Sequence, residues 1–236
     1  MQLGTGVEVI EISKEGLWAL YKPAGVMSHP NKPGEEAQSL IVAPYDGKEE
    51  AFITDEGPYF LLHRLDSPTS GLILVTPFAR VADEVRELFR ARKVKKTYYA
   101  IVANFPLPGK EKGLWRDKLN KTHTKEGGVR GAAMGGGAPA ETQMCLIKKF
   151  HKPIGSSLLE LKPLTGRTHQ LRIQCARRKM PIIGDATYGD FTLNRELKAK
   201  NLFLHAAKIE IPAIKFCVEC EPPTYFERWM KPHRAN

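Results

Sequence analysis

The sequence predicts an α+β fold with a mixed, mostly antiparallel sheet flanked by helices. Segments typical of strands outnumber segments typical of helices along the chain. The two kinds also do not alternate regularly, as they would in a doubly wound parallel sheet. One segment, residues 77–92, has a clear helical period, which places at least one long helix beside the strands.

The expected strands share short alternating or continuous apolar runs that are rich in β-branched and aromatic residues. They cover residues 7–12, 17–21, 72–75, 97–103, 157–162 and 202–211. In the expected helix, apolar side chains recur at the i, i+3, i+4, i+7 spacing of a single buried face. These are Phe78, Val81, Ala82, Val85, Leu88 and Phe89.

Turn and loop signals complete this prediction. A second helix is expected to open after residues 165–168, and the glycine-rich residues 127–140 are expected to form a flexible loop. No internal repeat of 20–50 residues is visible, and a chain of 236 residues can form one large domain or two small ones.

The composition is that of an ordinary cytoplasmic protein. The N-terminus lacks the apolar region of a signal peptide, and no run of about 18 apolar residues predicts a membrane span. The four cysteines are too scattered for a disulfide framework, which fits a reducing compartment. Cys217 and Cys220 form a lone C-x-x-C without a second pair of zinc ligands, so we expect no metal site.

Positive charge is concentrated in one part of the chain. The whole chain has a net charge of +10 and a pI near 9.4. Residues 86–130 contain thirteen basic and four acidic residues, a net charge of +9 that includes Lys93, Lys95 and Lys96. Such a cluster is typical of a surface that binds a polyanion, most often nucleic acid. The alternative is an ordinary solvated face.

A polar cluster precedes the apolar run 72–75. It contains Arg64, Asp66, Thr69 and Ser70, followed by the turn residue Gly71. One interpretation is that Asp66 only caps this turn. The other is catalytic, because a carboxylate kept ionised by arginine can attack a sugar carbon or take a proton from it.

Other catalytic classes fit less well. The chain has no Walker loop, no G-x-G-x-x-G and no G-x-S-x-G motif. A glycosidase would need a second carboxylate in a comparable motif. A serine triad with Ser70 and His169 stays open, although nothing places Ser70 on a nucleophile elbow.

Six blocks of residues, in this order, make the sequence resemble the RluA-type pseudouridine synthases. They are Lys22-Pro23-Ala24-Gly25, His63-Arg64-Leu65-Asp66 with Thr69-Ser70-Gly71, Lys96-Thr97-Tyr98, Thr165 to Arg172, Pro181 to Asp185, and Leu204-His205-Ala206. The family often has histidine two residues after the position of Arg172, where this chain has Gln174. This difference concerns the subfamily rather than the activity.

The resemblance implies the fold of this family, a single catalytic domain over residues 1–236, and a role for each matching residue. Asp66 resembles the aspartate that acts on C1′ or C2′ of the target uridine. Tyr98 resembles the tyrosine that stacks on the base and takes part in proton removal at C5, and Arg172 resembles the arginine that pairs with the aspartate. Arg64 resembles the residue that fills the gap left by the flipped uridine, and Leu204 the apolar residue beneath the base.

The resemblance also implies an RNA substrate and no cofactor. Only about twenty residues precede Lys22, so no N-terminal S4 RNA-binding domain is expected, and RNA contacts fall to the catalytic domain and its basic stretch. The stretch 189–195 is most similar to members that modify tRNA, with rRNA as the other substrate class, and we expect a monomer. The alternatives are a non-catalytic RNA-binding protein that retains the fold, and a nucleoside hydrolase.

Overall fold

The computed structural model describes residues 1–123, 129–132 and 137–230, which form two compact units. Unit 1 comprises Met1–Lys96 and Ala206–Pro222, and unit 2 comprises Thr97–His205 and the chain from Pro223 onward. The expectation of one catalytic domain over residues 1–236 stays a prediction, because this division concerns packing alone. No helix in the described ranges is long and apolar enough to cross a membrane.

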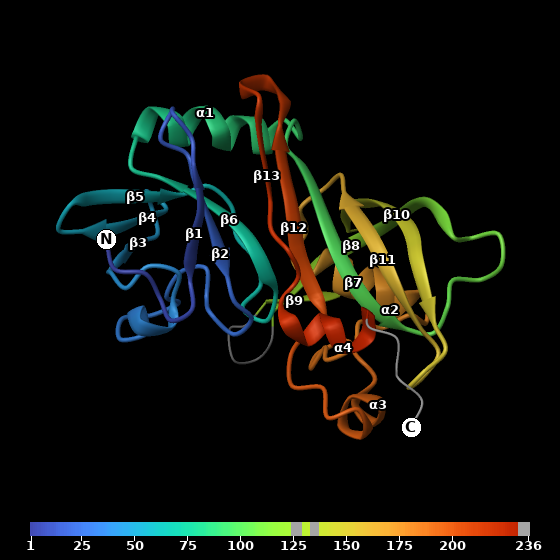
Figure 1. Cartoon of the computed structure of the whole chain (residues 1–236). Coiled ribbons are helices and arrows are strands. Elements are labelled where there is room, and N and C mark those ends of the chain that lie inside the picture. Colours follow the sequence, from blue (N-terminus) through green and yellow to red (C-terminus); the bar gives the residue numbers. More distant parts are fainter. Residues whose placement is uncertain (124–128, 133–136, 231–236) are drawn as a thin grey trace. The chain divides into compact units, whose positions relative to one another are not determined.

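Unit 1 is built on antiparallel strands (Figure 1). Its strands are β1 (Glu8–Ile12), β2 (Trp18–Lys22), β3 (Tyr45–Asp46), β4 (Ala51–Thr54), β5 (Gly57–Leu61), β6 (Ser70–Thr76), β13 (Phe216–Glu219) and most of β12 (Leu204–Ile211). Their order is β3-β4-β5-β6-β12, with β2 paired to β6, β1 to β2 and β13 to β12. Helix α1 (Ala79–Arg90) and the short 3₁₀ helices η1 (Glu36–Gln38) and η2 (Pro212–Ile214) belong to the same unit.

Strand β6 explains why the sequence has an uninterrupted apolar run before the helix. All seven of its residues are buried. Leu72 and Leu74 pack on one side with Ala82 and Val85 of α1, whereas Ile73 and Val75 belong to a separate cluster with residues of β2, β4 and β5. A strand with two buried faces needs apolar side chains on both, so alternation is absent. The start of β6 is therefore fixed by packing on both faces, directly after the polar loop that contains Asp66.

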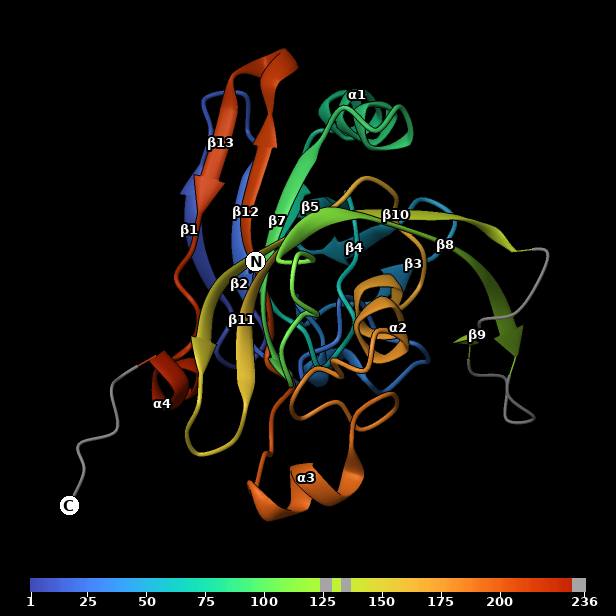
Figure 2. The same cartoon turned by 90° about the vertical axis from the view of Figure 1, so that its right-hand side faces the viewer.

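Unit 2 contains long strands and short helices (Figure 2). Its elements are most of β7 (Lys95–Ala103), then β8 (Lys112–His123), β9 (Val129–Ala132), β10 (Ala138–Phe150), β11 (Ser156–Pro163), α2 (Gln170–Arg177), α3 (Phe191–Glu196), the 3₁₀ helix η3 (Thr224–Phe226) and α4 (Glu227–Met230). The strand order is β12-β7-β11-β10-β8-β9, and β8, β10 and β11 pair antiparallel. The α+β class and the mostly antiparallel sheet are confirmed.

The predicted elements are largely present. Helix α1 lies within the expected 77–92, and β1, β2, β6, β7, β11 and β12 occupy the expected strand positions within a few residues. The loop expected over 127–140 is wrong where this segment is described: 129–132 form β9, paired with the end of β8, and 138–140 begin β10. Residues 127–128 and 133–136 of that prediction lie outside the described residues. The reason is that β8 offers partners to both segments, and such pairing overrides a local glycine preference.

Candidate active site

Asp66 lies in the loop that joins β5 to β6 in unit 1. Its side chain is half-buried, between the buried Leu65 and the buried Thr69. The carbonyl of Asp66 accepts a hydrogen bond from the N–H of Thr69 at 2.9 Å. The turn that the sequence predicts is therefore closed by the backbone itself.

The loop carrying Asp66 is held by the turn after β2 on both sides of the aspartate. Before Asp66, Leu65 donates its N–H to the hydroxyl of Ser28 at 3.0 Å, and this hydroxyl donates to the carbonyl of Leu65 at 2.7 Å. After Asp66, the carbonyl of Ser67 accepts from the N–H of Gly25 at 2.8 Å, and the Ser67 hydroxyl donates to the Gly25 carbonyl at 2.9 Å. The backbone at Asp66 is thereby fixed from both directions.

Lys22 completes this arrangement from inside the protein. The side chain is fully buried, and its Nζ donates to the carbonyls of Pro23 (3.0 Å), Val26 (2.7 Å) and Ser67 (3.0 Å). Burial lowers the pKa of Lys22 to about 7, and attraction to the Asp66 carboxylate opposes this shift. The lysine of the K-P-A-G block thus has a structural role and interacts electrostatically with Asp66.

Gly71 ends the loop at a position that no other residue fits. Its φ is +119°, a backbone conformation that side chains disfavour. A Cβ there would lie 2.3 Å from the carbonyl oxygen of Ala206 in β12. The glycine therefore permits close contact of β6 with β12 directly after the Asp66 loop.

Arg64 and His63 occupy contrasting environments just before Asp66. Arg64 is exposed, and its Nη1 lies 2.8 Å from Nε2 of His29. His63 packs against the ring of Phe89, and its Nε2 accepts from the N–H of Leu74 at 3.2 Å. Burial, with a contribution from the charge of Lys96, lowers the pKa of His63 to about 3. His63 is therefore a neutral packing residue at physiological pH rather than a general acid.

In unit 2, Arg172 is a buried residue of α2 that forms a bidentate ion pair. Its Nε and Nη2 donate to the two carboxylate oxygens of Asp185, each at 2.8 Å. The ring of Tyr188 packs against the guanidinium with its centroid 5.2 Å away. Asp185 was not predicted as a partner of Arg172 from the sequence. The expected pairing of Arg172 with Asp66 joins residues of different units and stays a prediction.

Asp185 is itself fixed by the loop that follows it. The N–H groups of Thr187 and Tyr188 donate to Oδ1 at 2.8 and 3.0 Å. Burial alone would raise the pKa of Asp185, but the hydrogen bonds and charge of Arg172, with these two N–H groups, lower it below its ordinary value. Asp185 is therefore ionised, and it fixes the orientation of Arg172.

Tyr98 and Leu204 also belong to unit 2 and lie on neighbouring strands. Both side chains are buried, Tyr98 in β7 opposite Leu161 of β11, and Leu204 at the start of β12. The N–H of Ile101 donates to the carbonyl of Phe203 at 3.0 Å, which joins the two strands. Of the predicted site residues, unit 2 therefore contains Tyr98, Arg172 and Leu204, and unit 1 contains the other five, Asp66, Arg64, Lys93, Lys95 and Lys96.

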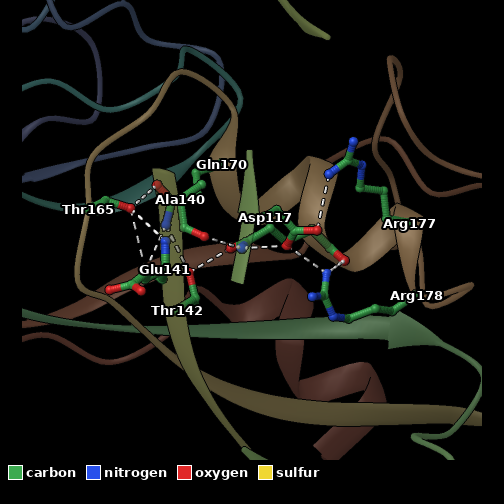
Figure 3. A network of polar contacts seen from close by, with 9 residues as sticks. Asp117, Ala140, Glu141, Thr142, Thr165, Gln170, Arg177 and Arg178 are labelled. Atoms are coloured by element: carbon green, nitrogen blue, oxygen red, sulfur yellow. Dashed lines mark hydrogen bonds and ion pairs between the residues drawn. The ribbon is translucent and has the colours of Figure 1, made fainter. Parts of the chain in front are cut away.

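A buried polar network holds the helix that carries Arg172 (Figure 3). Gln170 donates to the Thr142 hydroxyl at 2.9 Å and to the carbonyl of Glu141 at 3.0 Å, and it accepts from the Thr165 hydroxyl at 2.7 Å. One turn later, the side-chain oxygen Oε1 of Gln174 accepts from the same Thr142 hydroxyl at 2.6 Å. The two glutamines therefore join α2 to β10.

Gln174 extends the network to β8. Its amide donates to Asp117 at 2.8 Å and to the carbonyl of Ala140 at 3.2 Å, and Asp117 also pairs with Arg177 and Arg178, each at 3.0 Å. Burial would raise the pKa of Asp117, but the Gln174 hydrogen bond and the two arginines lower it. Gln174, the residue at which the chain departs from the family pattern, thus has a structural role.

The basic stretch is not uniform. Lys93 and Lys95 are exposed. Lys96 is half-buried, with Nζ 5.9 Å from the centroid of the Phe89 ring, and burial lowers its pKa. Arg86 donates to the carbonyls of Glu49, Glu50 and Leu61, so it has a structural role in unit 1.

Within residues 1–123, 129–132 and 137–230, no group of three or more His, Cys, Asp or Glu could hold a metal ion.

Comparison with known proteins gives consistent matches. The family described as RNA pseudouridylate synthase matches residues 16–177. A tRNA pseudouridine synthase C of Vibrio cholerae is 30% identical over 207 residues, which cover 83% of this chain and 81% of that one. A ribosomal large subunit pseudouridine synthase C of Rickettsia bellii is 28% identical, and the match covers 94% of this chain and 70% of that one. The solved human RNA pseudouridylate synthase domain containing 4 has a TM-score of 0.69 at 25% identity, covering 94% and 91%.

Proposed function

Because the chain belongs to the RNA pseudouridylate synthase family, and is therefore an isomerase that converts uridine in RNA to pseudouridine, we propose that Asp66 is its catalytic residue. The observation that carries this proposal is the pair of hydrogen-bonded clamps that fix the backbone on both sides of Asp66. A turn already closed by a backbone hydrogen bond does not require such support. A carboxylate that acts on a sugar carbon does require such support, because the reaction rate falls steeply when the reacting groups are misplaced.

The reaction redistributes bonds within one nucleotide. The bond between N1 and C1′ breaks, a bond between C5 and C1′ forms, and the proton lost at C5 is balanced by one gained at N1. We assign Asp66 to C1′ or C2′ of the ribose while the uracil is detached. Tyr98 then stacks on the base and takes part in proton removal at C5, Leu204 lies beneath it, and Arg172 pairs with Asp66.

Because the rearrangement involves no redox change, we expect it to need neither a metal nor an organic cofactor. We further propose that the enzyme acts as a monomer in the cytoplasm. RNA contacts come from Arg64 and from the cations after α1, Lys93, Lys95 and Lys96.

We propose tRNA as the substrate in preference to rRNA. Several relatives at about 30% identity are named tRNA pseudouridine synthase C, and relatives named for the ribosomal large subunit are 28% and 29% identical. The test uses unmodified tRNA and unmodified rRNA fragments, with pseudouridine mapped by carbodiimide treatment and primer extension. Pseudouridine formed in rRNA alone would contradict tRNA as the substrate but would still agree with the proposed reaction.

The catalytic role of Asp66 is tested with Asp66→Asn. This change keeps the size of the side chain and removes its charge and nucleophilicity. Pseudouridine formation should fall by more than about ten-thousandfold, beyond the loss of a helper acid or base. RNA affinity should persist, because phosphate contacts carry most of the affinity.

The matched control is Asp46→Asn. Asp46 is an exposed aspartate of unit 1 whose Oδ1 accepts from the N–H groups of Lys48 and Glu49, so it is a genuine turn cap. Asparagine preserves such a cap, and wild-type activity is expected. If Asp66→Asn were as active as this control, Asp66 would be a turn cap as well. A folded wild-type protein that binds RNA and forms no pseudouridine would favour the non-catalytic alternative.

A further inference from the structure

We propose that His29 is a positioning residue for Arg64, holding its guanidinium in place before RNA arrives. The proposal rests on the proposed function, in which Arg64 contacts RNA. His29 lies 35 residues before Arg64 and belongs to none of the blocks that identified the site. An exposed arginine normally samples many rotamers, and ordering it on binding costs affinity. A protein group that orders it beforehand avoids that loss.

The contacts of His29 define its tautomer. Its Nδ1 lies 2.9 Å from the carbonyl oxygen of Pro30, which can only accept a hydrogen bond. Its Nε2 lies 2.8 Å from Nη1 of Arg64, which can only donate. Nδ1 therefore carries the proton, Nε2 is the acceptor, and the imidazole that binds Arg64 is neutral.

The ring of His29 is itself held by aromatic packing. It stacks on Tyr45 with ring centroids 4.6 Å apart and an angle of 10° between the planes. Tyr45 in turn contacts the edge of the buried Phe52, with centroids 5.0 Å apart. Burial raises the pKa of Tyr45 to about 12, so the phenol stays neutral beneath the imidazole. Phe52 in the core, Tyr45 and His29 thus pack one against the next, and His29 contacts the exposed guanidinium of Arg64.

The hydrogen bond from Arg64 depends on the free acceptor site at Nε2 of His29. Protonation puts hydrogen on Nε2, which can then no longer accept from Arg64, and it places two cations side by side. The charged groups that act on Tyr45 in this stack are Glu50, Arg64, Arg86 and Asp46. On the segment of His29, Lys32 and Glu35 pair with each other at 3.6 Å. The contact with Arg64 therefore requires the neutral form of the His29 ring.

Two substitutions of His29 separate the contribution of its aromatic ring from that of its acceptor nitrogen. His29→Phe keeps the stack on Tyr45 and removes Nε2, and kcat/KM for pseudouridine formation should fall about tenfold to a hundredfold. Arg64→Ala should show a similar loss, and the double variant should lose little more than either single one. His29→Gln keeps a side-chain oxygen that can accept from Arg64, so it should retain more activity than His29→Phe.

The control is Lys32→Ala, at an exposed residue three positions from His29, and this change should leave the activity at the wild-type level. The proposal is overturned if folded His29→Phe matches an active wild-type protein, or if the losses of His29→Phe and Arg64→Ala multiply. A second measurement does not depend on activity: ¹⁵N chemical shifts of the His29 ring in the free protein should show the Nδ1–H tautomer near pH 8. A dominant Nε2–H tautomer would also overturn it, even if the protein formed no pseudouridine.

Discussion

At the scale of single residues, Arg172 and Asp185 form a buried charged pair that the fold cannot easily lose. Both side chains are at most 5% exposed, and the two hydrogen bonds between them are bidentate. Asp185→Asn removes a carboxylate from a buried guanidinium, so the free energy of unfolding should fall by about 3–5 kcal/mol. Urea unfolding measures this loss.

A control for this change lies five residues away. Asp190→Asn alters an exposed aspartate that caps α3 by accepting from the N–H of Leu193 at 3.0 Å. Asparagine caps a helix equally well, so stability should stay within about 0.5 kcal/mol of wild type. Equal losses in the two variants would mean that the ion pair contributes no special stability.

Lys22 gives a prediction with a defined pH dependence. Its pKa is lowered by burial from 10.5 in the unfolded chain to about 7 in the folded protein. Between these values the unfolded chain binds one more proton than the folded one, so stability rises with pH, by about 1.4 kcal/mol per unit at most. Urea unfolding at pH 7, 8 and 9 should show this rise in wild type, less of it in Lys22→Met, whatever the overall stability of the variant. Parallel pH profiles would contradict the shifted pKa.

At the scale of elements, the network around α2 depends on Gln174. The side chain is fully buried and bonds to both Thr142 and Asp117. Gln174→Leu leaves these polar groups without one partner, and the free energy of unfolding should fall by about 1–3 kcal/mol. Gln174→His, the residue often found in the family, offers one donor and one acceptor and should be milder.

The exposed Gln143 on β10 provides the control for that measurement. Gln143→Leu should change stability by less than about 0.5 kcal/mol, because surface substitutions rarely do more. If Gln174→Leu behaved in the same way, the buried network would add no stability to α2.

The elements also show what sequence patterns can and cannot predict. Strand β6 and helix α1 were predictable because each has a single dominant pattern, a continuous apolar run and a 3.6-residue period. Strand β8 was not, since exposed Arg116 and Lys118 alternate with buried Trp115 and Leu119, and the charges suggested an RNA-binding surface rather than a strand. A strand that is basic on one face has a charge signal and a period of two at once.

At the scale of the whole molecule, resemblance identifies the proposed site residues, but it does not predict their contacts. Asp66, Tyr98 and Arg172 lie in recognisable blocks. Asp185 lies in such a block too, yet its pairing with Arg172 depends on how the loop after α2 folds back. His29 contacts Arg64 across 35 residues, and Lys22 reaches Ser67 across 45. Such contacts depend on tertiary structure, which no local pattern encodes.

The proposal that the basic stretch binds RNA is tested by the salt dependence of RNA affinity. Binding that neutralises phosphates releases counterions, so the logarithm of affinity falls linearly with the logarithm of salt concentration. Lys93 and Lys95 are exposed, whereas Lys96 is half-buried, so we expect the first two to carry most of the phosphate contacts from this segment. Lys93→Gln with Lys95→Gln should weaken RNA binding and reduce the slope by about 1.5, on the order of 0.7–0.9 per contact.

The control for this double variant removes the same charge elsewhere in unit 1, with Lys14→Gln and Lys48→Gln, both exposed and outside residues 86–130. Its slope should match that of the wild-type protein, because the overall charge falls equally but no phosphate contact is lost. The measurement is RNA affinity by fluorescence anisotropy from about 50 to 200 mM salt, the range in which such contacts change affinity most visibly. Identical slopes in the two double variants would show that the segment after α1 does not face the RNA, and the cations that bind it would then have to be sought on unit 2.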